Sequence, residues 1–234
     1  MQFRSKRYRA LIQSAGIDLK QAQTVNAAVG VVKKLAKAKF NETVELAIHL
    51  NLDTKKVDQQ FRGSFSLPNG TGRDVRVLVF CDDGEKSQAA MAAGAVKAGG
   101  EDVVNEVLAG FMDFDVAVAT PKMMRLVGKL GKVLGPRGLM PSPKAGSVTD
   151  DVAKAVGEFK GGKIEYRADA AGNVQVRVGT AKFEEQKLAE NINSFIAHVA
   201  EHRPSSVKGE FVKNIVVSST MGPGVKVAFS AKEA

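Results

Sequence analysis

Tryptophan is absent from this chain of 234 residues, and tyrosine occurs only twice. Unpaired bases stack on flat aromatic side chains, so this scarcity argues against a protein that grips single-stranded nucleic acid. The single cysteine, Cys81, excludes an internal disulfide framework and is typical of a reducing cytosol. No apolar run approaches the roughly 18 residues that a membrane helix needs, so we expect no membrane partner. Residues 1–10 are basic and lack a following apolar stretch, which predicts a solvated arm and no secretory signal.

Basic residues are distributed unevenly along the chain. Residues 1–67 contain 12 Lys and Arg against 5 Asp and Glu, and residues 160–234 contain 11 against 8. Residues 68–159 differ, because they contain 11 basic and 12 acidic residues. We therefore expect one basic domain built from 1–67 and 160–234, with 68–159 inserted as a second domain. The net charge of +9 points to a polyanionic partner, and nucleic acid is the leading candidate.

Apolar side chains in both ends recur at the spacings of helices and half-buried strands. Residues 26–40 and 184–202 repeat them every three to four positions, which predicts two amphipathic helices. Alternation of apolar and polar residues predicts strands at 44–50, 61–67, 215–219 and 225–229. The same alternation on both sides of Ala171-Gly172-Asn173 predicts a hairpin over 164–178. These patterns indicate an α+β fold for the basic domain.

The middle segment has a different pattern. Residues 75–80 and 114–119 are almost continuously apolar, which is typical of strands covered on both faces. Helical patterns at 85–98 and 122–131 alternate with these strands, and another helix is expected between residue 150 and residue 160. The alternation of strand and helix predicts a parallel sheet, so the inserted domain is expected to be a Rossmann-like α/β domain.

Residues His198-Val199-Ala200-Glu201-His202 match a zinc-protease pattern, in which two histidines hold the metal and the glutamate acts as base. Both histidines flank the last turn of a helix, where histidine is favourable to the helix dipole. His49 is the only other histidine and no cysteine lies near, so we expect no metal and no catalytic residues. A zinc enzyme therefore remains an unlikely alternative.

A nucleotide-dependent enzyme is a second alternative, because phosphates often bind at the helix that follows a strand of a parallel sheet. The segment after Phe80 is Cys81-Asp82-Asp83-Gly84-Glu85, and its three carboxylates would repel a pyrophosphate. Neither the dinucleotide-binding glycine motif nor a Walker loop is present. We therefore expect no cofactor.

The segment Gly135 to Gly146 contains three prolines and three glycines within twelve residues. Proline fixes the backbone and glycine allows close approach, so a specifically shaped loop is predicted. Its cations Arg137 and Lys144 have two open interpretations: they bind phosphate, or they brace the two domains against each other.

Two short segments have the residue types that bind RNA. Lys37, Lys39 and Phe40 combine cations with an aromatic side chain at the end of a helix, although a buried core position for Phe40 is equally compatible with the pattern. In Ser218-Ser219-Thr220-Met221-Gly222, hydroxyls can pair with phosphates or ribose, and the alternative is an ordinary turn. A DNA-binding regulator remains a third functional class, separable by comparing structured RNA with duplex DNA.

Several motifs occur together in an order that is known from one family. They are Lys6-Arg7-Tyr8, Ala38-Lys39-Phe40-Asn41-Glu42-Thr43-Val44, Asp58-Gln59-Gln60-Phe61-Arg62-Gly63, Met112-Asp113-Phe114-Asp115, Gly135 to Gly146, Lys187-Leu188-Ala189-Glu190-Asn191-Ile192 and Thr220-Met221-Gly222-Pro223. With these motifs the chain resembles the bacterial type of the large-subunit ribosomal protein L1 family over almost its whole length. Many relatives have Gly-Lys where this chain has Gly179-Thr180, with Lys182 as the nearest following cation.

The resemblance implies a discontinuous α+β domain interrupted by an α/β domain. It implies a cytoplasmic structural constituent of the large ribosomal subunit that binds folded 23S ribosomal RNA and is a monomer outside the ribosome. It further implies a mobile stalk at the tRNA exit site that helps deacylated tRNA to leave, and repression of translation from the chain's own operon mRNA. The RNA-binding residues expected from the resemblance and the basic segments are Lys6, Arg7, Lys37, Lys39, Phe40, Thr43, Lys182, Ser219, Thr220, Met221 and Gly222.

Overall fold

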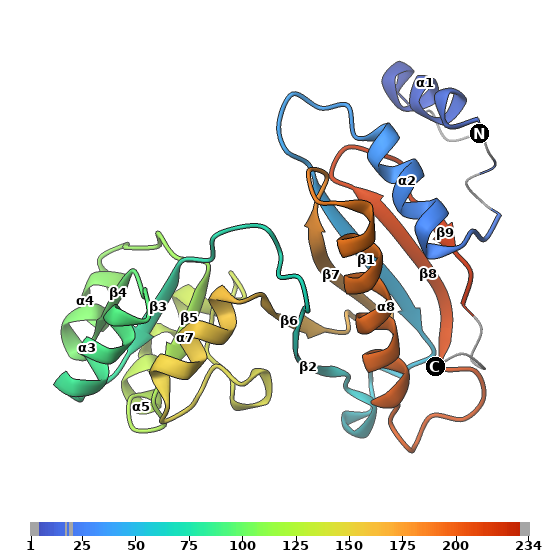
Figure 1. Ribbon diagram of the computed structural model, residues 1–234. Coiled ribbons are helices and arrows are strands. Elements are labelled where there is room, and N and C mark those ends of the chain that lie inside the picture. The colour runs from blue at the N-terminus through green and yellow to red at the C-terminus, as the bar shows by residue number, and fades with distance from the viewer. Residues whose placement is uncertain (1–4, 17, 19–20, 230–234) are drawn as a thin grey trace. The chain divides into compact units, whose positions relative to one another are not determined.

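A computed structural model describes residues 5–16, 18 and 21–229 (Figure 1). The chain folds into two compact units, Met1–Arg73 with Tyr166–Ala234, and Asp74–Glu165. Each unit contains both helices and strands, so the mixed α and β composition is as predicted. Across the described residues, no helix combines the length and the apolar character that crossing a membrane requires.

A four-stranded sheet forms the centre of the first unit. Its order is β7 (Asn173–Thr180), β1 (Thr43–Leu50), β8 (Val212–Ser219) and β9 (Val225–Val227). All three pairings are antiparallel, so β1 lies between two strands that follow it far along the chain. Every second residue of β1, from Val44 to Leu50, is buried, which confirms the predicted alternation.

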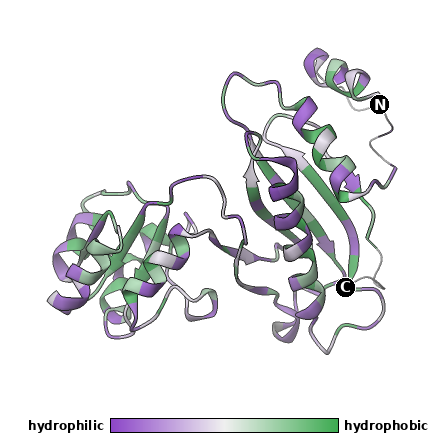
Figure 2. Cartoon of the chain, viewed as in Figure 1, coloured by the Kyte–Doolittle hydropathy of each residue, from purple (hydrophilic) through white to green (hydrophobic). Residues whose placement is uncertain are grey.

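The helices α2 (Val25–Leu35) and α8 (Glu185–Glu201) cover one face of this sheet and pack against each other (Figure 1). Apolar and polar residues alternate around both helices (Figure 2). The predicted helix over 26–40 ends at Leu35, and residues 36–42 form a loop before β1. The sheet and these helices enclose the core of the unit.

The beginning of the chain is not the solvated arm that the sequence predicts. Residues Lys6–Ala15 form helix α1, which begins where the Ser5 side chain accepts a hydrogen bond from the Tyr8 N–H. It ends at Gly16, whose φ of 68° is in the left-handed region that favours glycine. Leu11 is buried, so the helix has an apolar side despite its basic sequence. Residues 1–4 of the predicted arm lie outside the described residues.

The predicted hairpin over 164–178 is wrong. Strand β6 (Lys163–Arg167) pairs with β2 (Arg62–Ser66) in a separate two-stranded sheet, whereas β7 pairs with β1. The close approach of the first pair depends on Gly63, because a Cβ at this position would lie 2.7 Å from the Tyr166 hydroxyl oxygen. A short 3-10 helix, Val57–Gln59, precedes β2.

The second unit contains a parallel sheet with the order β4 (Lys97–Gly99), β3 (Val77–Phe80) and β5 (Val116–Ala119). All four residues of β3 are buried, and the predicted parallel pairing is confirmed. Leu78 and Phe80 pack in one apolar cluster and Val77 and Val79 in another, so both faces of the sheet are covered. The helical elements are α3 (Gly84–Ala92), α4 (Glu101–Leu108), α5 (Met124–Val127), η2 (Gly128–Leu130), α6 (Gly131–Leu134), η3 (Pro143–Ala145) and α7 (Val152–Lys160).

Candidate nucleic-acid interface

Most of the residues predicted to bind RNA gather at one end of the four-stranded sheet. Strand β1 begins there at Thr43, and β7 and β8 end there. Thr43 pairs with Thr180, and the next residue of β1, Val44, pairs with Ser219. Two loops therefore meet at this end: residues 36–42, called the 36–42 loop, and residues 220–224, called the 220–224 loop. They lie far apart in the sequence.

A buried carboxylate, Glu42, joins the two loops. Its side-chain oxygen Oε1 accepts a hydrogen bond of 2.9 Å from the Ala38 N–H of its own loop. Its other oxygen, Oε2, accepts 2.8 Å and 3.0 Å bonds from the Ser219 hydroxyl and the Met221 N–H. Only 2% of Glu42 is exposed, so these bonds are shielded from water. The carboxylate thereby fixes the relative position of the two loops.

The environment of Glu42 favours its charged form. Burial by itself would raise the pKa of this carboxyl group. The hydrogen bonds from Ala38, Met221 and Ser219, together with the nearby charge of Arg7, outweigh that effect and lower the pKa below its usual value. Glu42 is therefore an ionised acceptor in a basic neighbourhood, where it holds donors in place.

Thr220 continues the pairing of β8 with β1 by one residue. Its N–H donates to the Thr43 carbonyl at 3.0 Å, and its hydroxyl oxygen accepts from the Thr43 N–H at 3.0 Å. The same hydroxyl lies 3.3 Å from the Thr43 carbonyl, to which it donates. Two of the three hydrogen-bonding positions of the hydroxyl are thus used within the protein, and one acceptor position is left.

Ser219 and Gly222 shape the turn that follows β8. Ser219 is 4% exposed and its hydroxyl bonds to Glu42, so the side chain lies inside the protein. The Gly222 N–H donates to the Ser219 carbonyl at 3.1 Å. A Cβ at Gly222 would lie 2.5 Å from the Ser219 hydroxyl oxygen, which is too close. Glycine at this position therefore allows the turn to close over Ser219.

Two large apolar side chains lie exposed in these loops. Phe40 is 55% exposed and Met221 is 42% exposed. This exposure decides between the two interpretations of Phe40, because a core position would bury its ring. Lys37 and Lys39, in the same loop as Phe40, are exposed as well. The 36–42 loop thus exposes an aromatic ring together with two cations.

The remaining predicted residues border the same end of the sheet. The Arg7 guanidinium of α1 donates from Nη1 to the Met221 carbonyl at 2.9 Å, which ties this helix to the 220–224 loop. Its neighbour Lys6 is exposed. On the side of β7, the Ala181 N–H donates to the main-chain carbonyl of Glu42 at 2.8 Å, and the next residue, Lys182, is exposed.

Comparison with known proteins identifies the family. A sequence profile of the Ribosomal protein L1p/L10e family matches residues 32–223. The chain belongs to this family. It is 53% identical over 224 residues to the large ribosomal subunit protein uL1 of Thermosipho melanesiensis, with 95% of each chain covered. The proteins of the same name from Fervidobacterium nodosum and Streptococcus pneumoniae are each 52% identical over 224 residues, which cover 95% and 96% of this chain and 94% and 96% of theirs.

Membership in the L1p/L10e family makes the chain a ribosomal protein. It confirms the family prediction, the absence of an enzymatic role and the location on cytoplasmic ribosomes. The ordered, basic surface with exposed apolar side chains described above is therefore a surface of a ribosomal protein.

Glu42 is the residue of this family member that sequence reasoning missed. It was part of the motif Ala38 to Val44, but no role was predicted for it. The alternation of β1 indicates that the Glu42 side chain points inward. Every second residue after Glu42 is buried, namely Val44, Leu46 and Ile48. A carboxylate in the inward phase of a strand must find donors inside the protein, which here are the two loops.

The histidine pair of the zinc-protease pattern is part of an aromatic cluster. His198 Nε2 lies 2.9 Å from the Tyr166 hydroxyl oxygen, and the rings of His198 and His202 are 4.0 Å apart between centroids. Burial, and then the charge of His202, lower the pKa of His198. Within the described part of the chain, no group of three or more His, Cys, Asp or Glu side chains is placed to hold a metal ion.

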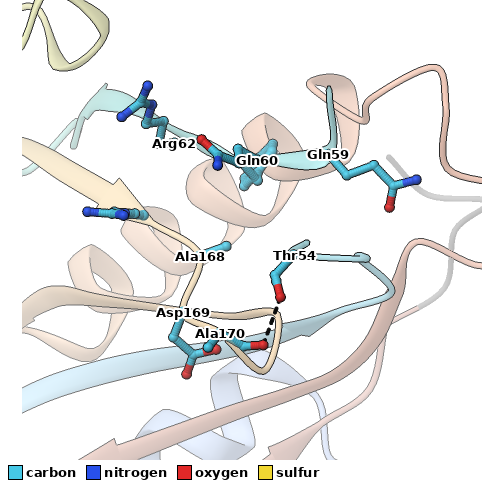
Figure 3. A pocket seen from close by; sticks show the side chains of 9 residues that line it. Thr54, Gln59, Gln60, Arg62, Ala168, Asp169 and Ala170 are labelled. Carbon is cyan, nitrogen blue, oxygen red and sulfur yellow. Dashed lines mark hydrogen bonds between the residues drawn. The ribbon is translucent and has the colours of Figure 1, made fainter. Parts of the chain in front are cut away.

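A pocket of about 240 Å³ lies beside the β2–β6 sheet of the first unit (Figure 3). Several of its polar groups are bonded within the protein: the Thr54 hydroxyl donates to the Ala170 carbonyl at 2.9 Å, and Gln59 Oε1 accepts from the Asp53 N–H at 2.7 Å. Asp169 accepts hydrogen bonds from Asn173, which lower its pKa. These contacts hold the loops around the pocket together.

Proposed function

We propose that the chain is a structural constituent of the large ribosomal subunit, which binds a folded segment of 23S ribosomal RNA at the sheet end of its first unit. The names of its relatives support the assignment to the large subunit. The observation that carries the RNA proposal is the Glu42 carboxylate that holds two loops together beneath exposed cations and apolar side chains. A surface fixed in this way suits the recognition of an RNA shape.

The proposed residues have two kinds of role. Phe40, Thr43, Thr220, Met221 and Gly222 provide close contacts with ribose and base edges, through exposed side chains and main-chain groups. The cations Lys6, Lys37, Lys39 and Lys182 neutralise phosphates around them. Ser219 and Arg7 serve as positioning residues for the 220–224 loop, since the first bonds to Glu42 and the second to the Met221 carbonyl.

The proposal assigns RNA binding to the domain made of residues 1–67 and 160–234. Residues 68–159 form the inserted domain, which we regard as Rossmann-like because a parallel sheet has helices on both faces. The two compact units, with limits at Arg73 and Tyr166, support this division. The protein is a monomer outside the ribosome. On the ribosome it forms the mobile stalk at the tRNA exit site and helps deacylated tRNA to leave.

A second role uses the same interface. Because the interface reads the shape of a folded RNA, an mRNA segment that folds similarly binds to it in competition with ribosomal RNA. We propose that the protein represses translation of its own operon mRNA in this way. The resemblance to the L1 family supports this role.

Salt-dependent binding to a 23S ribosomal RNA fragment tests the main proposal. Lys39→Gln should weaken binding and reduce the slope of log affinity against log salt by about one, because one phosphate contact is lost. Lys213→Gln is the matched control, since Lys213 is an exposed cation near the opposite end of β8. Equal effects of the two substitutions would contradict the proposed interface.

Binding of duplex DNA separates the alternative of a DNA-binding regulator. At one salt concentration, the parent protein should bind the folded ribosomal RNA fragment at least tenfold more tightly than a DNA duplex of the same length. This preference should disappear in Phe40→Ala, since an exposed ring that contacts a base contributes about 1 to 3 kcal/mol. Tighter binding of the DNA duplex by the parent would favour the regulator.

A further inference from the structure

The near-neutral charge of the second unit conceals a strong separation of charge. Residues 74–115 contain nine acidic and three basic residues. Residues 116–149 contain six basic residues and neither Asp nor Glu. The cations are therefore concentrated in the part of the unit that begins with β5 and continues through the helical segments α5, η2 and α6. A net charge near zero does not describe the surface that a partner would meet.

Three of these cations lie on one side of the helical segments, and a fourth precedes them. Arg125, Lys129 and Lys132 follow each other at intervals of four and three residues, so they share one side, and Lys122 lies in the turn before α5. All four are exposed. The buried residues of the same segment are Met123, Val127, Leu130 and Leu134, each at most 3% exposed. The segment is thus amphipathic, with an outward side formed by cations.

The following loop adds two more exposed cations. Arg137 and Lys144 belong to the segment rich in proline and glycine, which is held to its own unit by internal bonds. The Leu139 N–H donates to the Leu134 carbonyl at 3.1 Å, and the Ser142 N–H donates to the Ser147 hydroxyl at 3.0 Å. The loop is therefore ordered, and it continues the basic surface beyond α6.

None of these six cations has an acidic partner among the described residues. Other cations of the same unit are paired: Arg76 with Asp115, Lys86 with Asp150, and Lys163 with Glu158. Adjacent like charges repel one another, so an unpaired row of cations costs free energy in the isolated protein. A bound polyanion removes this repulsion and releases its own counterions.

We propose that the basic stripe, defined as Lys122, Arg125, Lys129, Lys132, Arg137 and Lys144, binds the phosphate backbone of double-helical RNA. Its helical part alone is ~15 Å long at 1.5 Å per residue, which spans several phosphates. Residues 116–149 contain no Phe, Tyr or Trp, so the surface offers nothing on which bases could stack. Binding is therefore independent of sequence. RNA is the chosen polyanion because the chain is a ribosomal protein, and the proposal does not depend on the RNA contacts of the first unit.

Binding of a 20-base-pair RNA duplex of arbitrary sequence by the full-length protein tests the proposal. Replacing Lys122, Arg125, Lys129 and Lys132 together with glutamine should lower the slope of log affinity against log salt by about 3, because up to four phosphate contacts are lost. At low salt the affinity should fall more than about tenfold. A matched variant replaces Lys86, Lys97, Lys154 and Lys160 with glutamine, which changes the charge of the same unit equally. Its affinity should stay within about threefold of the parent.

The position of the duplex can be read from lysine protection. Brief acetylation of the parent protein, with and without the duplex, is followed by mass spectrometry of its peptides. Lys122, Lys129, Lys132 and Lys144 should be protected several-fold by the duplex, whereas Lys154 and Lys160 should react equally in both samples. This measurement uses unsubstituted protein, so it remains decisive if the fourfold variant fails to fold.

Three results would overturn the proposal. Equal losses in the stripe variant and the matched variant would show that only net charge matters. Unprotected stripe lysines would place the duplex elsewhere. Displacement of the duplex by a poly-glutamate peptide at equal charge concentration would indicate a site for acidic proteins in place of RNA.

Binding of the folded 23S fragment should change less than about twofold in the stripe variant. The RNA contacts proposed for the first unit are tested separately, by measuring how Lys39→Gln changes binding of the 23S fragment.

Discussion

The two basic surfaces of this protein differ in how their side chains are held in position. At the sheet end of the first unit, a buried carboxylate, a closed turn and a shared hydroxyl fix two loops that are distant in the sequence. On the second unit, cations repeat along one segment that contains no aromatic residue, and they have no acidic partner within the part of the chain that the structure describes. The first arrangement suits recognition of shape, and the second suits attraction to any phosphate backbone.

The difference shows that the net charge of a sequence segment indicates the basic surface of the first unit but not that of the second. The sheet end of the first unit contains an acidic residue, Glu42, which fixes the positions of the two loops. The second unit has almost no net charge, and its stripe becomes visible only when the cations are placed on the helix. Substitutions that disturb loop position should therefore affect folded RNA alone, and substitutions that remove cations of the stripe should affect the arbitrary duplex far more than the folded fragment.

The largest effect is expected from Glu42→Gln. The amide is uncharged and has one acceptor oxygen in place of two, so the donors Ala38, Ser219 and Met221 all lose a charged partner and at least one of them loses its acceptor. The free energy of unfolding should fall by about 2 to 3 kcal/mol, since hydrogen bonds to charged groups contribute about 1.5 to 3 kcal/mol each. Affinity for the 23S fragment should fall more than about tenfold, measured by filter binding at a temperature where the variant is folded.

Glu45→Gln provides the control for this substitution, because Glu45 is an exposed carboxylate on the same strand. It should leave stability within about 0.5 kcal/mol of the parent. Glu42→Gln should leave binding of the arbitrary duplex by the second unit unchanged. An equal loss on both RNAs would contradict the distinction between the two surfaces.

Gly222→Ala should have the next largest effect. The added Cβ would lie 2.5 Å from the Ser219 hydroxyl oxygen, so the 220–224 loop must move. Overpacking of this kind costs about 1 to 3 kcal/mol, and affinity for the 23S fragment should fall about tenfold. Isothermal titration measures this affinity. Adding Ser219→Ala removes the obstructing oxygen, so the double variant should bind more tightly than Gly222→Ala alone; a further loss would show that the clash is not the cause.

Thr220→Val should have a smaller effect. The Thr43 N–H loses its acceptor at this partly exposed position, which costs about 1 kcal/mol of stability. The remaining acceptor position of the hydroxyl is lost to RNA too, so affinity should fall about five- to tenfold. Thr220→Ser keeps the hydroxyl and should bind like the parent. Weak binding by Thr220→Ser would show that the methyl group, and not the hydroxyl, makes the contact.

The last prediction concerns the dependence of stability on pH. The pKa of Glu42 is lower in the folded protein than its usual value near 4.3, so Glu42 contributes stability above that pH and loses this contribution as the pH falls further. Urea unfolding of the parent and of Glu42→Gln should therefore show a stability difference that narrows as the pH falls below about 4.3. A constant difference over this range would mean that the charge of Glu42 contributes nothing.

Local sequence patterns located most of the strands and helices but not all of their partners. The alternation at Ile164 and Tyr166 correctly indicated a strand, and a turn with glycine followed it, yet β6 pairs with β2 and β7 with β1. Pairing depends on which apolar faces meet in three dimensions, and adjacent alternating segments do not contain that information. Helix α1 was missed because its cations concealed the single buried position, Leu11.

The candidate site was predicted in its residue types but not in its organisation. Exposed cations and an aromatic residue could be found from the sequence, since Lys39 and Phe40 are neighbours at the end of a helical pattern. The inward position of Ser219 could not be found in this way, because its partner Glu42 lies 177 residues away. Sequence patterns show which residues can bond, and only the fold shows which of them do.

The central position of β1 imposes an order on the synthesis of the protein. Both strands that pair with it, β7 and β8, are made more than a hundred residues later, whereas Asp74–Glu165 is contiguous. The inserted unit can therefore fold first, and the unit that begins the chain is completed last, which reverses the usual order of domain folding on the ribosome. Because the donor Met221 is made 179 residues after Glu42, a growing chain that has not reached Met221 lacks the locked loops.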